Sequence, residues 1–166
     1  MGLWGLMAVS NGFAGTIYVP GDYPSIQAGV DAAAAGDEIV VAPGTYTSTQ
    51  AGHVVNMKGK AVTLRSSDGP EVTIIDGEGA RRGVACFNAE TAATIIDGFT
   101  ITDGLSVPYD YDGDRRAIKN SLEISGGGVC CYQASLSIRN CVVVNNHTEY
   151  AGGGVSVYRG SIHVDG

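Results

Sequence analysis

Short apolar runs separated by turn-forming residues make up most of this chain. Within each run, apolar and polar side chains alternate, and Gly, Asn or Asp follows after a few residues. This alternation is typical of β-strands that bury one face. It predicts strands at Thr16–Val19, Glu38–Ala42, Val54–Asn56, Ala61–Arg65, Val72–Asp76, Val84–Phe87, Thr94–Asp97, Phe99–Thr102, Val129–Tyr132, Leu136–Arg139, Val142–Asn145, Val155–Tyr158 and Ile162–Asp165.

One segment near the start has a different period. Apolar residues, among them Ile26 and Val30, recur there at helical spacing, which predicts a helix over Ser25–Ala35. Asp22 stands where an N-cap is expected, and Gly36 is a suitable residue to end the helix.

Two short sequences recur along the chain. Val-Thr-Ile-Ile-Asp-Gly at 72–77 returns as Ala-Thr-Ile-Ile-Asp-Gly at 93–98, and Gly-Gly-Gly-Val at 126–129 returns at 152–155. Similar strands at intervals of about 20–30 residues are typical of a solenoid, in which each repeat forms one coil of a stack. We therefore predict an all-β solenoid of about five coils, with residues 25–35 as a helical cap.

Alignment of the repeats groups apolar residues into columns that face the interior. Parallel strands in successive coils place equivalent positions about 4.8 Å apart, so each column is expected to stack directly. The four columns are Val84, Val129 and Val155; Cys86, Cys131 and Val157; Ile75, Ile96, Ile138 and Val164; and Ile101 with Val143. The same alignment puts Asp76 beside Asp97, either as a glycosidase carboxyl pair or, in preference, as a ladder of turn residues.

Composition limits the classes of protein to which the chain can belong. Of its 166 residues, 25 are Gly, yet 44% are hydrophobic, which argues against disorder and favours one domain with a continuous core. The formal net charge is −7 and the pI is near 4.7, so the surface repels phosphate backbones and a nucleic-acid partner is not expected. No apolar run in the sequence approaches the length of a membrane span.

Residues 1–14 form a separate segment in our interpretation. Leu3–Val9 is a short apolar run, and Gly12 and Ala14 are small residues at the spacing of a signal-peptidase site. We interpret 1–14 as the remainder of a secretory signal peptide, which leaves one domain at 15–166 and places it outside the cell. The alternative is an apolar strand that caps the core.

Longer stretches of the sequence resemble a known superfamily. The stretch TIYVPGDYPSIQAGVDAAAAGDEIVVAPGTY, followed by GPEVTIIDGEG, GFTITDG and GGGV, is similar to the right-handed parallel β-helix proteins of the pectin-lyase-like superfamily, above all to large secreted bacterial repeat proteins. The resemblance extends from about Thr16 to Gly166. It implies an N-terminal cap followed by coils of three sheets, secretion or display at the cell surface, and contact with polysaccharide.

The catalytic motifs of that superfamily do not occur in this sequence. Pectin methylesterases carry Gly-x-Tyr-x-Glu, whereas here Gly44-Thr45-Tyr46-Thr47 is followed by Ser48, and the polygalacturonase motifs are missing as well. We therefore predict a secreted or cell-surface scaffold that contacts polysaccharide or extracellular matrix, without catalysis. One alternative is a fragment of a polysaccharide lyase or glycoside hydrolase. Another is a structural subunit that stacks end to end.

Three aromatic residues form the candidate carbohydrate site. Phe87, Tyr132 and Tyr158 each follow an inward position of the aligned repeats by one residue, so alternation turns them outward. A column of exposed rings can stack against the apolar faces of sugar rings. The alternative is that the rings pack on each other and stabilise the sheet by ordinary cross-strand contact.

The segment between Gly104 and Gly126 interrupts the repeats and carries the candidate metal site. Asp110, Asp112 and Asp114 alternate with tyrosines there, and alternate carboxylates on a short loop can converge on Ca²⁺. The segment lacks the later Glu of an EF-hand loop, and a solvated acidic turn is the alternative. Ca²⁺ is thus a candidate cofactor, and no residue is a catalytic candidate.

The last strand of the chain carries an expectation about partners. Ile162–Asp165 has an inner face suited to contact with a further coil. Because an open sheet edge recruits partners, the chain is either a fragment of a longer protein or associates with itself through this C-terminal coil.

Two smaller motifs complete the sequence-based expectations. Alternation directs Cys130 outward, which makes it the candidate reactive thiol. Asn146-His147-Thr148 fits the pattern of an N-glycosylation acceptor.

Overall fold

Residues 14–106, 126–148 and 152–165 are described by the computed structural model, so the expected signal segment at 1–14 lies almost wholly outside it. The described part consists mainly of parallel β-strands with one short helix, which is not long and apolar enough to cross a membrane. The helix is α1 (Ile26–Ala32). The strands are β1 (Thr16–Val19), β2 (Glu38–Val41), β3 (Gly44–Tyr46), β4 (His53–Asn56), β5 (Thr63–Ser66), β6 (Thr73–Asp76), β7 (Arg82–Cys86), β8 (Ile95–Asp97), β9 (Thr100–Thr102), β10 (Leu105–Ser106), β11 (Val129–Tyr132), β12 (Ser135–Arg139), β13 (Val142–Val144), β14 (His147–Thr148), β15 (Val155–Tyr158) and β16 (Ser161–Asp165).

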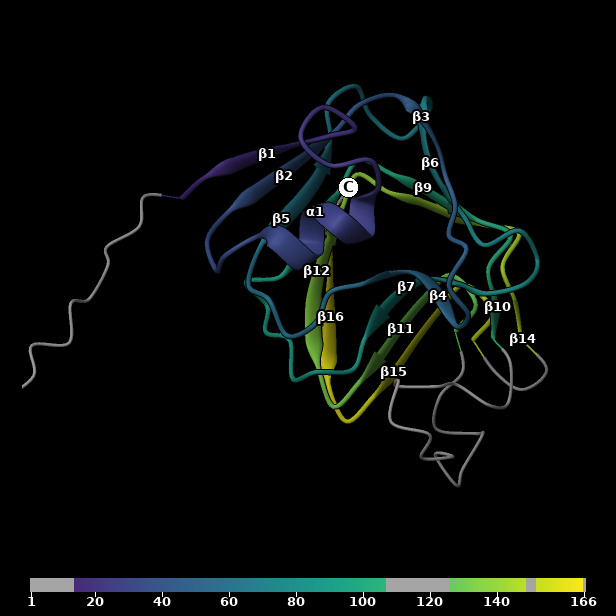
Figure 1. Ribbon diagram of the computed structural model, residues 1–166. Helices are drawn as coiled ribbons and strands as arrows, with labels where there is room; N and C mark the ends of the chain where they lie inside the picture. Colours follow the sequence, from purple (N-terminus) through teal and green to yellow (C-terminus); the bar gives the residue numbers. More distant parts are fainter. Residues whose placement is uncertain (1–13, 107–125, 149–151, 166) are drawn as a thin grey trace, which may run out of the picture.

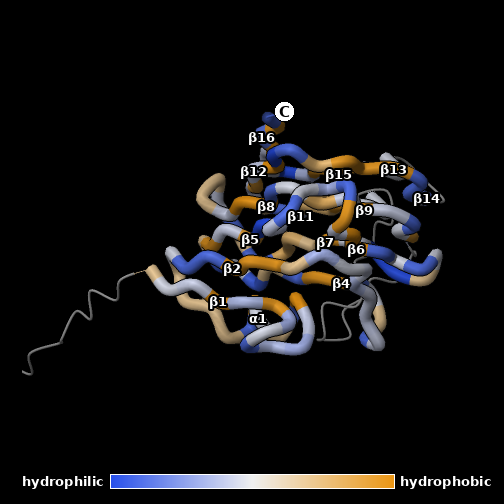
Figure 2. The backbone as a smooth tube through the Cα atoms, turned by 90° about the horizontal axis from the view of Figure 1, so that it is seen from above, coloured by the Kyte–Doolittle hydropathy of each residue, from blue (hydrophilic) through white to orange (hydrophobic). Residues whose placement is uncertain are grey.

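Hydrogen bonding joins these strands into three larger sheets and one small pair. Sheet A has the order β1-β2-β5-β8-β12-β16, sheet B the order β3-β6-β9-β13, and sheet C the order β4-β7-β11-β15, while β10 pairs with β14. The chain passes from A to B to C and then returns to A beside the strand that it left. Figure 1 shows the sheets around a shared interior, and Figure 2 shows the successive layers from another side.

Strand registers confirm most of the expected columns. The pairings found are Val84–Val129–Val155, Cys86–Cys131–Val157, Ile96–Ile138–Val164 and Ile101–Val143. The exception is Ile75, which pairs with Ile101 in sheet B and not with Ile96 in sheet A. The segments at 72–77 and 93–98 therefore lie in different sheets, because a similar strand sequence serves in β6 and in β8.

The two Gly-Gly-Gly-Val segments, in contrast, stack directly on each other. Gly127 donates its N–H to the carbonyl oxygen of Gly153 (2.8 Å), and Gly83 in the preceding layer donates to the carbonyl oxygen of Gly127 (2.9 Å). A Cβ atom at Gly128 would lie 2.5 Å from the carbonyl oxygen of Gly154. Backbones this close leave no room for side chains, which explains the glycines at this corner.

Asn146 holds the neighbouring corner together. Its Nδ2 atom donates to the carbonyl oxygens of Ile101 and Val144 (both 2.9 Å), and its Oδ1 atom accepts from the N–H of Gly104 (2.7 Å). Because three hydrogen bonds engage both ends of the amide, Asn146 has a structural role at this corner, and the glycosylation pattern stays a prediction.

The N-cap of α1 is Ser25 and not Asp22. The Oγ atom of Ser25 accepts a hydrogen bond from the N–H of Ala28 (3.2 Å), as an N-cap does. The Asp22 carboxylate instead accepts from the N–H of Tyr18 (2.7 Å) and closes the turn after β1. The inner face of α1, which includes Val30, is buried. The helix covers the end of the stack formed by the first layers (Figures 1 and 2).

The opposite end of the stack is open among the described residues. The core lies between the three sheets, and inner residues such as Val129 and Cys131 have no exposed surface. Their partners in the last layer are different: Val155 is 38% exposed and Val157 41%, while Val164 of β16 is 68% exposed. Apolar side chains that alternation turns inward thus reach solvent at this end.

Candidate functional site

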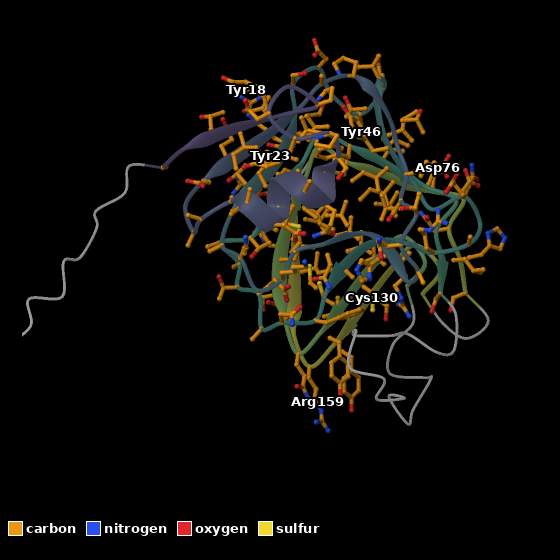
Figure 3. The ribbon with its side chains drawn as sticks, viewed as in Figure 1. Tyr18, Tyr23, Tyr46, Asp76, Cys130 and Arg159 are labelled. Carbon is orange, nitrogen blue, oxygen red and sulfur yellow. The ribbon has the colours of Figure 1, made fainter. Side chains whose placement is uncertain are left out.

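Tyr132 and Tyr158 form a stacked pair at the ends of β11 and β15. The two residues are register partners, their ring centroids are 5.3 Å apart, and the ring planes differ by 8°. The guanidinium carbon of Arg159 lies 5.1 Å from the centroid of the Tyr158 ring, and Figure 3 shows Arg159 at the outer edge of the molecule. The ring of Tyr158 thus lies between the ring of Tyr132 and the guanidinium group of Arg159.

Phe87, the third expected aromatic residue, has a different partner. It follows the last residue of β7, is half-buried, and its ring centroid lies 5.9 Å from the guanidinium carbon of Arg82. Arg82 is fully buried and donates to the carbonyl oxygen of Gly126 (3.2 Å) and to the Oγ atom of Ser106 (3.0 Å). The ring of Phe87 therefore helps to hold a buried cation in place.

Cys130 does not fit the expectation of a reactive thiol. It lies between Ala85 and Ser156 of the adjacent strands, yet its side chain is fully buried, so solvent does not reach the sulfur atom. Cys86 and Cys131 lie in the core, as their inward column predicted, and both are free thiols. The pKa of Cys86 is raised well above its usual value, mainly by a hydrogen bond with Cys131 and to a smaller extent by burial.

The candidate calcium ligands Asp110, Asp112 and Asp114 lie outside the described residues, so the calcium site stays a prediction. Within the described ranges, no three His, Cys, Asp or Glu side chains gather in a way that could hold a metal ion. Those ranges consequently offer no second location for a metal centre.

The expected alignment of Asp76 with Asp97 is wrong, because the two residues belong to different sheets and so form neither a carboxyl pair nor the preferred ladder of turn residues. Asp76 ends β6 in sheet B, whereas Asp97 in sheet A pairs with Arg65 and Arg139 (Figure 3 labels Asp76). Arg139 in turn pairs with Asp165. The outer row of sheet A therefore alternates in charge, which stabilises neighbouring strands but provides no pair of carboxyls for glycoside hydrolysis.

A cleft of about 1,350 Å³ opens beside the helix, and we call it the α1 cleft. One wall is α1 with its N-cap, from Ser25 to Asp31. The other walls are the segment 46–54, which joins β3 to β4, the turn at 56–58, and residues 80–81 at the rim. The cleft shares no lining residue with the Tyr132–Tyr158 pair.

Hydrogen bonds fix the position of the α1 wall. The Oε1 atom of Gln27 accepts from the N–H of Asn56 (2.7 Å), and its Nε2 atom donates to Oδ1 of Asp31 (2.9 Å). The Nζ atom of Lys58 lies 2.7 Å from the same Asp31 oxygen. Burial raises the pKa of Asp31, but the bonds from Lys58 and Gln27 outweigh burial and lower it overall. The carboxylate is therefore ionised at neutral pH and held within one network.

His53 also lines the cleft, at the start of β4. Burial lowers the pKa of His53, and the positive charges of Arg82 and Lys58 lower it further, so the imidazole is neutral at pH 7. The Nδ1 atom of this ring is buried and has no hydrogen-bond partner in the described part of the chain. A buried ring nitrogen in this state disfavours protonation of the native protein.

Sequence reasoning did not identify the α1 cleft. The four-residue spacing of Gln27 and Asp31 indicates that they share one face of the helix. Their partners Asn56 and Lys58 come from a turn much later in the chain, however, and no motif connects the two segments. Only the packing of α1 against β4 brings these four residues together.

Comparisons with known proteins add no assignment. No protein-family model matches the chain, and no curated protein or solved structure matches it. Its function is therefore inferred from the sequence motifs and from the geometry described above.

Proposed function

We propose that this chain is a right-handed parallel β-helix that acts, in a secreted or cell-surface setting, as a scaffold in contact with polysaccharide. Support for the fold comes from the passage of the chain through sheets A, B and C in rotation and from the parallel register of each layer. Support for kinship with the pectin-lyase-like superfamily comes from the sequence motifs. Such a stack presents side chains at intervals of about 4.8 Å, which suits a long, regular partner.

The single observation that carries the proposal is the stacked Tyr132–Tyr158 pair with Arg159 beside it. Ring edges offer apolar contact, and the phenol and guanidinium groups offer hydrogen bonds, which is the combination that a sugar chain requires. Stacking also holds the rings before a ligand arrives, so binding costs less side-chain entropy. Neither enzymatic alternative has a comparable observation in its favour among the described residues.

Affinity electrophoresis in gels that contain xylan, β-glucan or pectin tests this proposal. We expect the wild-type protein to be retarded by at least one of these polymers without degrading it. Tyr158→Ala should weaken retention roughly tenfold or more, because large aromatic residues are frequent hot spots of binding. Tyr18→Ala, which truncates an exposed tyrosine outside the pair, is the matched control and should be retained like the wild type. Equal retention of the Ala variant, or no retention by any polymer, would contradict the proposal.

The open end of the stack favours a second candidate function, self-association. Val155, Val157 and Val164 are exposed although they continue buried columns, and β13, β15 and β16 are the last strands of their sheets. Because α1 covers the other end, two copies would meet through their open ends and form a closed dimer. The occupant that we propose for this end is therefore a second copy of the chain.

Light scattering coupled to gel filtration tests this second function. The wild-type protein should elute as a dimer at about 100 μM, since self-association depends on concentration. Val164→Lys should elute as a monomer, because a buried ammonium group opposes the interface. Val72→Lys, at another exposed valine, should remain dimeric. A wild-type monomer at this concentration would show that the open end does not pair with itself.

A further inference from the structure

The α1 cleft combines a large volume with polar groups that are already in position. Its volume of about 1,350 Å³ exceeds the 300–1,000 Å³ that is usual for sites of small ligands. It therefore has room for a ligand of more than one sugar unit. Such a site shares no residue with the Tyr132–Tyr158 pair, although it suits the same class of polymer.

The α1 wall offers a hydrogen-bond acceptor beside a donor. The side chain of Asp31 is 45% exposed and that of Lys58 is 49% exposed, so a ligand can reach both partners of the ion pair. One hydroxyl of a sugar can donate to the carboxylate while its neighbour accepts from the ammonium group. Gln27 holds Asp31 in place through its own hydrogen bond (2.9 Å), which pre-organises the pair.

The facing wall supplies hydroxyl groups and one aromatic ring. Ser48 and Gln50 lie in the segment 46–54, where the N–H of Gln50 donates to Oγ of Ser48 (3.0 Å). The ring of Tyr46 (Figure 3) is fixed by its hydroxyl, which donates to the carbonyl oxygen of Ala42 (2.8 Å). A ring held in this way gives an apolar surface for the C–H groups of a sugar.

The charges around the cleft favour a neutral ligand. Lys58 is paired with Asp31, and Arg81 at the rim is paired with Glu78. Both cations of the lining are thus compensated within the described residues, and the whole chain carries a net charge of −7. A carboxylate or sulfate on the ligand would therefore find no excess positive charge.

The cleft also lacks the groups for cleavage of a glycosidic bond. Asp31 is the only carboxylate among its described lining residues, whereas hydrolysis ordinarily requires two, one as acid and one as base or nucleophile. The arrangement consequently favours binding without turnover.

We propose that the α1 cleft binds a neutral oligosaccharide segment of about two or three sugar units, with adjacent hydroxyls held between Asp31 and Lys58. The inference rests on the proposed function for the class of ligand. It adds a second binding site, formed by α1 and the segment 46–54, to the Tyr132–Tyr158 pair.

Titration of the ¹⁵N-labelled chain, residues 1–166, with maltotriose, cellotriose, xylotriose and, separately, trigalacturonate tests the inference by NMR. At least one neutral trisaccharide should shift the amide signals of Gln27, Gln50 and Asn56 in a saturable way below about 10 mM. Asp31→Asn should weaken this binding roughly tenfold, because a hydrogen bond to a charged group is lost. Ala28→Trp should block the cleft without a change of charge.

Glu71→Gln is the matched control, since it removes an exposed carboxylate that does not line the cleft. Tyr158→Ala should leave the cleft signals unchanged, so a failure of the aromatic site and a failure of the cleft can be told apart. The inference is wrong if no neutral trisaccharide shifts the cleft signals, if binding survives in both Asp31→Asn and Ala28→Trp, or if trigalacturonate binds more tightly.

Discussion

Inward side chains are buried at one end of the stack and exposed at the other. At the α1 end, Val19 of the end strand β1 is 1% exposed, whereas Val164 of the end strand β16 at the other end is 68% exposed. Both are inward, β-branched residues of sheet A. The difference arises because a helix covers one end and no described element covers the other. Burial in this fold thus depends on the neighbouring layer and not only on alternation within a strand.

The largest effect is expected from Ile39→Ala. The side chain is fully buried, and the methyl groups of Ile39 and Val19 lie near Gly29 of α1, so truncation leaves a cavity under the helix. We expect a loss of about 2–5 kcal/mol in the free energy of unfolding. Urea denaturation followed by circular dichroism measures this loss. A loss below about 1 kcal/mol would mean that α1 does not seal this end tightly.

A smaller effect is expected from Ser25→Ala, which removes the N-cap of α1. The hydrogen bond from the N–H of Ala28 is lost, and we expect the free energy of unfolding to fall by about 1 kcal/mol. The matched control is Ser161→Ala at the open end, where the exposed hydroxyl of Ser161 donates to Oγ of the half-buried Ser135 (3.0 Å). If both variants unfold at the same urea concentration, the N-cap hydroxyl of Ser25 stabilises the protein no more than the surface hydroxyl of Ser161 does.

The dependence of stability on pH should also differ between the two ends. Burial lowers the native pKa of His53 below the 6.5 of an unfolded histidine. As the pH falls, the unfolded chain therefore takes up a proton on His53 before the native protein does. The contribution of His53 to stability is complete above about pH 6.5 and is lost as the pH falls below it. His53→Gln should flatten the pH profile of urea midpoints below pH 6.5. His163→Gln, at an exposed ring of β16, is the control, and equal profiles for all three proteins would refute the expectation.

The smallest effect is expected from Val164→Ala. Because most of this side chain already contacts solvent, its truncation should change the free energy of unfolding of the monomer by less than about 0.5 kcal/mol. Denaturation at low protein concentration measures the monomer alone. A larger loss there would show that Val164 packs more firmly than its exposure implies.

Alternation along the chain was sufficient to predict most strands, but not the sheet to which each one belongs. Ile75 was assigned to the wrong column because β6 and the segment 94–97, which contains β8, both have the sequence Thr-Ile-Ile-Asp, and the same inner residue suits either sheet. The Gly-Gly-Gly-Val repeat was a better guide, since consecutive glycines are required where the backbones of successive layers lie in contact. The strands β3, β10 and β14 were missed, and each has only two or three residues, too few for a period to be clear.

The candidate site was predictable where it depends on register alone. Tyr132 and Tyr158 pair because they hold equivalent places on adjacent strands, and the same logic extends to the inner cysteines. The prediction that Cys130 is exposed was wrong, since alternation gives the side of the sheet on which a residue lies but not what covers that side. The α1 cleft depends on how a helix packs beside a long connection, which strand periodicity does not encode.

The parallel registers have a consequence for the lengths of the connections. Leu64, Ile96, Ile138 and Val164 are successive partners in sheet A, yet 32, 42 and 26 residues separate them along the chain. Backbone hydrogen bonds keep the axial distance constant while the corners absorb the differing amounts of chain. The spacing between layers is therefore independent of the length of the connections. A peptide inserted at a corner should leave the axial distances between side chains on the sheets unaltered.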